Sequence, residues 1–61
     1  MFMRFKFWNK DFSEDEIVKL APFIPAVGDS VMYKEKWYEV SERGIDLDTG
    51  KYTKIHCKET E

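Results

Sequence analysis

The sequence predicts a small, mainly β (α+β) domain: an antiparallel barrel or bent sheet of about four strands, with one short helix at about residues 14–20, in the order β–α–β–β–β. Three observations lead to this prediction. Apolar and polar residues alternate at the N-terminus, a helix-capping pattern follows, and residues 25–43 contain two runs of aromatic and β-branched residues around a charged turn. An open sheet with the helix on one face is the competing arrangement.

The first predicted element is a strand over residues 1–8, where side chains alternate with a period of two. Its apolar face would point to the core and its other face is amphipathic. The inner set is Met1, Met3, Phe5 and Phe7, and the outer set is Phe2, Arg4, Lys6 and Trp8.

A capping pattern predicts the helix. Ser13 is placed as the N-cap with Glu16 three residues later, and Phe12 and Ile17 stand at the two positions of a hydrophobic staple. The acidic first turn suits the helix dipole, and Pro22 ends the segment.

The rest of the chain is predicted to be turns and strands. The Pro-flanked segment 22–26 should be extended, and residues 44–47 are expected either to extend the strand before them or to bulge from it, with Gly44 as the pivot. The expected elements in order are a turn at 27–29, a strand at 30–33, a charged connection at 34–36, a strand at 37–43, a hairpin turn at 48–50, a strand at 51–57 and a solvated tail at 58–61.

Length and composition limit the chemistry. The 61 residues make a single domain, 1–61, near the lower limit of independent folding, and its five Phe, three Tyr and two Trp must supply the core or an exposed interface. The one cysteine excludes an internal disulfide. One His and one Cys cannot complete a four-ligand zinc site, so no metal and no other cofactor is expected.

No catalytic residue is predicted, and the protein is not expected to be an enzyme. Asp48-Thr49-Gly50 has the letters of an aspartic-protease triplet, but a turn between strands explains it. His56 and Cys57 are strand neighbours, so their side chains point to opposite faces and cannot form a catalytic pair. Cys57 is expected in the core and His56 on the surface.

The candidate binding site is an aromatic strand face. Alternation places Tyr38 and Val40 on the inner face of residues 37–43, and Trp37 and Arg43 together on the outer face. An exposed Trp with Tyr and Arg neighbours has the composition of protein-interface hot spots. In the competing interpretation, Trp37 covers the open end of the barrel or packs under the helix. The candidate residues are Trp37, Arg43, Tyr33, Tyr52 and Trp8.

The charge balance of −2, with both signs interspersed, does not favour nucleic acid. A small-barrel nucleic-acid-binding protein remains the second hypothesis, because exposed rings stack bases and six cations stand near them in the predicted fold. Those cations are Arg4, Lys6, Lys34, Lys36, Lys51 and Lys54. The N-terminus is not typical of a signal peptide and no apolar run is long enough to span a membrane, so a cytoplasmic location is expected.

The pattern Pro25-x-Val27-Gly28-Asp29-x-Val31, followed by Trp37-Tyr38-x-Val40, resembles very short, uncharacterised proteins of phages, prophages and other mobile elements. The resemblance covers roughly residues 24–57 and implies an SH3-like small barrel with no established activity. The sequence as a whole predicts a non-enzymatic protein-interaction module with a protein partner or self-association. A structural subunit of a larger assembly is a third possibility.

Overall fold

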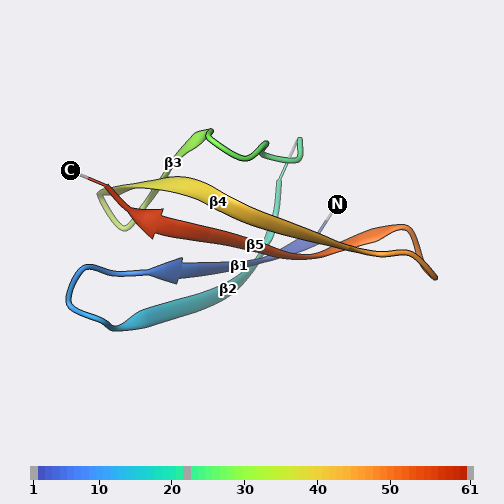
Figure 1. Ribbon diagram of the computed structural model, residues 1–61, viewed down its shortest axis with the longest axis horizontal. Helices are drawn as coiled ribbons and strands as arrows, with labels where there is room; N and C mark the ends of the chain where they lie inside the picture. Colours follow the sequence, from blue (N-terminus) through green and yellow to red (C-terminus); the bar gives the residue numbers. More distant parts are fainter. Residues whose placement is uncertain (1, 22, 61) are drawn as a thin grey trace.

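The computed structural model describes residues 2–21 and 23–60, and in this part of the chain it contains five strands (Figure 1). A mainly β fold is therefore confirmed. In chain order the strands are β1 (Phe2–Trp8), β2 (Glu14–Leu20), β3 (Ser30–Tyr33), β4 (Lys36–Asp46) and β5 (Lys51–Glu59).

The strands form one sheet in the order β2-β1-β5-β4-β3. The chain-adjacent pairs are antiparallel, whereas β1 and β5 lie side by side in parallel. The sheet curls into a half-barrel, so that β3 turns back over the concave face (Figure 1). Strands β2 and β3 are the two free edges. The structure thus resembles a small barrel that is left open between its first and last strands in sheet order.

The core lies on the concave face, and its buried side chains come from β1, β4 and β5. The alternation predicted for the first strand is confirmed for its described residues. The Tyr38 hydroxyl donates a hydrogen bond to Asn9 Oδ1, and burial, with Glu59 and Asp15 nearby, raises the pKa of Tyr38 above its usual value. The core residues are Met3, Phe5, Phe7, Tyr38, Val40, Ile55 and Cys57.

The predicted helix is wrong, because residues 14–20 form the edge strand β2. A seven-residue helix gains little by itself, whereas β2 pairs with β1 at every position from Glu14 to Leu20. Ser13 does not cap a helix: its backbone N–H donates to Asp11 Oδ1, which makes a side-chain turn between the two strands. Phe12 does not act as a staple either; it is 99% exposed at the tip of this hairpin.

The predicted hairpin of residues 30–43 is confirmed. Strand β3 has the predicted bounds, and Lys34 and Glu35 join it to β4 with φ angles of 50° and 65°. Two consecutive positive φ angles are typical of a type I′ turn, whose twist matches that of paired strands. The turn before β3 is also confirmed; Gly28, with φ of 97°, donates its N–H to the Val40 carbonyl oxygen.

Strand β4 extends through residues 44–46, and its pairing is irregular. Its pairing with β5 shifts register between Val40 and Glu42 and again between Gly44 and Ile45, so Gly44 lies at a bulge as expected. The hairpin turn at 48–50 is confirmed. The expected solvated tail is partly wrong, because β5 continues to Glu59 and the N–H of Thr60 donates to the Trp37 carbonyl oxygen.

Candidate binding groove

The concave face has an apolar groove of about 500 Å³ between the free edges β2 and β3. Four parts of the chain line it: β1, β2, the connection between β2 and β3, and β3 itself. The lining residues are Phe5, Phe7, Ile17, Lys19, Ala21, Phe23, Pro25, Asp29, Ser30, Val31, Met32 and Tyr33.

Stacked aromatic rings make the floor of the groove. The Phe7 ring lies parallel to the Tyr33 ring with centroids 4.3 Å apart, and parallel to the Phe5 ring with centroids 6.0 Å apart. Tyr33 comes from β3 and Phe7 from β1, which are separated by two strands in the sheet. The stack therefore holds β3 over β1 and fixes the depth of the groove.

The rim of the groove exposes large apolar side chains to solvent. Phe23, in the connection after β2, is 70% exposed, and Met32 on β3 is 56% exposed. A surface that keeps such side chains beside a concave apolar floor is typical of an interaction site. Lys19 and Asp29 are the two charged residues of the lining. The Asp29 carboxylate accepts the backbone N–H of Ala26, which fixes the turn that leads into β3.

The free edge of β3 offers hydrogen-bonding groups beside this rim. In a two-residue hairpin the residues that flank the turn exchange backbone hydrogen bonds, which here are Tyr33 and Lys36. Alternation then directs the backbone groups of Val31 toward β4 and those of Ser30 and Met32 away from it. The β3 edge can therefore pair with another extended chain.

The predicted aromatic face is only partly as expected. Tyr38 and Val40 are buried and Trp37 is 47% exposed, so these three side chains point as predicted. Arg43 does not share the outer face with Trp37, and that prediction is wrong. The bulge after Val40 inverts the alternation, so that Arg43 pairs with buried Ile55 and donates from Nη1 to the Pro25 carbonyl oxygen.

The other candidate residues are not gathered with Trp37. Tyr33 lies in the aromatic stack of the groove floor. Trp8 lies on the convex face, where the Lys6 ammonium stands 4.8 Å from its ring centroid. The Tyr52 side chain lies outside the described residues, although its backbone pairs with Ile45. The described side chains of this set lie on both faces of the sheet, so they do not make one continuous site.

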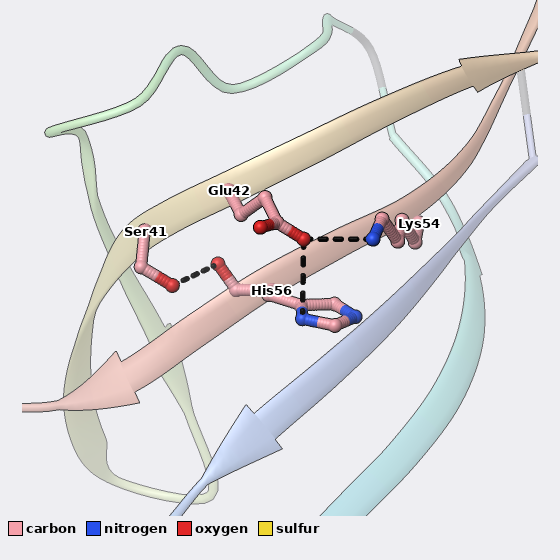
Figure 2. Close-up of polar contacts among 4 residues, drawn as sticks. All are labelled: Ser41, Glu42, Lys54 and His56. Atoms are coloured by element: carbon pink, nitrogen blue, oxygen red, sulfur yellow. Dashed lines mark hydrogen bonds and ion pairs between the residues drawn. The ribbon is translucent and has the colours of Figure 1, made fainter.

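A polar cluster occupies the convex face at the β4–β5 pair (Figure 2). Glu42 Oε1 lies 2.7 Å from Lys54 Nζ and 3.8 Å from His56 Nδ1. The Ser41 hydroxyl donates to the backbone carbonyl oxygen of His56 and not to its ring. Ser41 is therefore not activated by a base, and the cluster has the geometry of a surface ion pair rather than of a nucleophilic site.

The ion pair gives Glu42 a defined effect on stability. The Lys54 ammonium donates a hydrogen bond to the Glu42 carboxylate, and this bond is the main reason that the pKa of Glu42 lies below its usual value. The positive charge of Lys54 lowers that pKa further. A carboxyl group whose pKa is lower in the folded state than in the unfolded state stabilises the fold at pH values above its unfolded-state pKa. This stabilisation is lost as the pH falls through the folded-state pKa. We expect E42Q to lower the urea midpoint at pH 7, and the difference from the wild type should shrink as pH falls through the lowered pKa of Glu42. K54Q should behave in the same way, and a difference that does not shrink in acid would contradict this assignment.

Cys57 and His56 lie as predicted for neighbours on a strand. Cys57 is fully buried, whereas His56 is half-buried on the opposite face. Among the described residues, no three His, Cys, Asp or Glu side chains group closely enough to hold a metal ion. No helix in the described ranges is long and apolar enough to cross a membrane.

The groove itself was not predicted from the sequence. Its floor uses Phe5 and Phe7, which alternation assigns correctly to the core, and its rim uses Met32 and Phe23, which the alternation and capping patterns do not single out. The available signal was Phe23 between Pro22 and Pro25, a large apolar residue in a connection that cannot be helical.

Comparisons with known proteins identify no relative. No family model, no curated protein and no solved structure matches this chain.

Proposed function

We propose that this protein is a non-enzymatic protein-interaction module that binds an extended apolar segment of a partner protein in the groove between β2 and β3. The observation that carries the proposal is the apolar groove of about 500 Å³ beside the unpaired edge of β3. A bound segment would hydrogen-bond to Ser30 and Met32 through its backbone and direct alternate side chains onto Phe7 and Ile17. This is the mode of strand addition to a sheet edge.

The chemistry of the groove favours such a segment over a small polar ligand. Ten of the twelve lining residues are uncharged, and the floor consists of stacked aromatic rings. An alternating segment fits because it presents apolar side chains to one face and polar side chains to the other. Lys19 and Asp29 lie among the lining residues and can interact with a polar side chain of either sign.

The test uses two synthetic peptides of about eight residues, the length of an ordinary strand. In the first, valine alternates with threonine; in the second, a central threonine is replaced by proline, which removes a backbone donor. Titration of ¹⁵N-labelled protein with the first peptide should shift the amide resonances of Ser30, Met32 and Ile17. The proline peptide should bind at least about tenfold more weakly, because a strand with one fewer backbone hydrogen bond pairs poorly.

Two variants at exposed apolar positions locate the site. M32E places a charge at the rim of the groove and should weaken peptide binding, whereas L47E, in the exposed turn between β4 and β5, should not. W37A changes the convex face and should also leave binding intact. Loss of binding in W37A with normal binding in M32E would reject the groove and support the aromatic face. Failure of both peptides to shift any groove resonance would also reject the proposal.

Nucleic-acid binding is less consistent with the observed contacts. On the outer face, Arg4 Nε of β1 lies 4.0 Å from Glu16 Oε1 of β2. Beside it, Lys6 Nζ lies 3.4 Å from Glu14 Oε1. Lys54 lies 2.7 Å from Glu42. Three cations of the predicted set are thus already paired with carboxylates, which reduces the positive potential available to a phosphate backbone.

A further inference from the structure

We infer that β2 is a dimerisation edge, at which two copies of this chain pair antiparallel about a twofold axis through Ile17. Strand β2 is an edge of the sheet over seven residues, and its pairing with β1 has no register shift. A long and regular free edge is a template for another strand. A segment bound in the groove would pair with the β3 edge, whereas the second copy would pair with the β2 edge; Ile17 and Lys19 belong both to the groove lining and to β2.

The free edge of β2 is oriented for such pairing. The Asn9 N–H donates to the Ser13 carbonyl oxygen at the end of the hairpin, which makes these two residues a hydrogen-bonded pair. Alternation from this pair directs the backbone groups of Asp15, Ile17 and Lys19 toward β1. The backbone groups of four residues then point to the open side: Glu14, Glu16, Val18 and Leu20.

The fold leaves this edge accessible. Tyr33 of β3 stacks on Phe7, so β3 lies over β1 and does not cover the outer side of β2. Val18 and Leu20 are 61% and 62% exposed on the convex face of β2. A second copy would cover part of this apolar surface, since each Val18 lies diagonal to its equivalent across the axis.

Charge complementarity selects both the partner and the register. With the axis at Ile17, each Asp15 stands opposite Lys19 of the other copy, and the two Ile17 side chains face each other. Between the two copies, the backbone hydrogen bonds are made by the outer-face residues such as Glu16 and Val18. The inner-face pairs are therefore the non-hydrogen-bonded pairs, in which the two Cα atoms lie closer together. The Asp15 carboxylate already contacts Asn9 Nδ2 at 3.4 Å, which holds it on this face.

The neighbouring registers are less favourable. An axis at Glu16 places the two Glu16 carboxylates opposite each other, and an axis at Val18 places Lys19 opposite Ile17. Moving the axis by one residue shifts the pairing register by two residues. A register shifted by an odd number of residues would place the apolar inner residues of one copy on the outer face. Only the register centred on Ile17 forms two opposite-charge pairs without a like-charge pair, so the sequence of β2 is self-complementary in that register alone.

Charge reversal tests the register directly. By analytical ultracentrifugation at concentrations up to about 1 mM, the wild type should reach about twice the 7.3 kDa mass of one chain. K19E places two carboxylates opposite each other, and D15K places two ammonium groups opposite each other. Each should weaken the dimer by at least about tenfold while the circular dichroism spectrum is unchanged. The double variant D15K/K19E restores both opposite-charge pairs and should restore the dimer.

Disulfide trapping gives a second readout. I17C places two thiols in a closely spaced antiparallel pair, within the Cα separation that a disulfide spans, and should form a covalent dimer on mild oxidation. V18C is the matched control, since Val18 lies opposite Glu16 of the other copy and should not cross-link. A wild type that stays monomeric, a double variant that does not recover, or cross-linking of V18C in place of I17C would each overturn the inference. Peptide binding by a monomeric wild type would leave the groove function standing.

Discussion

Replacement of Phe7 by Ala should unfold most of the protein at 25 °C or lower its melting temperature by more than about 12 °C. Phe7 is 3% exposed, and its ring contacts those of Phe5, Tyr33 and Tyr38. A buried Phe→Ala change costs about 3–5 kcal/mol, and one kcal/mol shifts the melting temperature of a domain this small by about 4–8 °C. The whole stability of such a domain is only about 3–9 kcal/mol, at about 0.05–0.15 kcal/mol per residue.

The matched control for this prediction is another Phe→Ala change. Phe12 is 99% exposed at the tip of the first hairpin, and F12A should alter the free energy of unfolding by less than about 0.5 kcal/mol. Thermal melts followed by circular dichroism measure both variants. Equal effects of F7A and F12A would show that the aromatic stack does not hold β3 over β1.

Native Cys57 should react with a thiol reagent at least about a hundredfold more slowly than the unfolded chain. The side chain is fully buried, and burial raises the pKa of Cys57 from 9.0 to about 11. Two pKa units alone reduce the reactive thiolate fraction by about a hundredfold. Burial lowers the rate further, because the reagent reaches the sulfur only when the sheet opens. The measurement is the absorbance change with Ellman's reagent at pH 8, with and without guanidinium.

The raised pKa of Cys57 also predicts that the protein loses stability at alkaline pH. Because the folded pKa of Cys57 is raised, the thiol stabilises the fold fully below the unfolded pKa, and this contribution declines as pH rises from about 9 toward 11. The raised pKa of Tyr38 acts in the same direction. Urea midpoints that do not fall over this pH range, or native labelling at the unfolded rate, would contradict the buried position of Cys57.

Local sequence patterns predicted the parts of the fold that local forces decide. The period-two alternation of β1 assigns Met3, Phe5 and Phe7 to the core because each strand side chain has only two faces to choose between. The β3–β4 hairpin follows from its turn and its aromatic and β-branched residues. The short-helix prediction failed because β2 pairs with β1 at every position from Glu14 to Leu20, whereas a seven-residue helix has no comparable support.

Features that depend on distant residues were not predictable in this way. No local signal shows that β1 pairs with β5 rather than with another strand. Arg43 was assigned to the wrong face because one extra residue in β4 reverses all later side chains, and nothing in residues 37–43 requires that bulge. The groove combines residues from four segments, so it exists only once the sheet has curled. The resemblance to phage and mobile-element proteins and the SH3-like assignment stay predictions.

The parallel pairing of β1 with β5 has a consequence for how this chain reaches its native state. Strand β5 follows all the others in the chain, yet it lies at the centre of the sheet and joins two antiparallel hairpins, β1–β2 and β3–β4. Neither hairpin can bury its apolar face until that last strand arrives, since a two-stranded hairpin alone is marginal in water. Folding is therefore expected to be all-or-none and slow for the length of the chain, because closing the sheet requires contacts between residues about fifty positions apart.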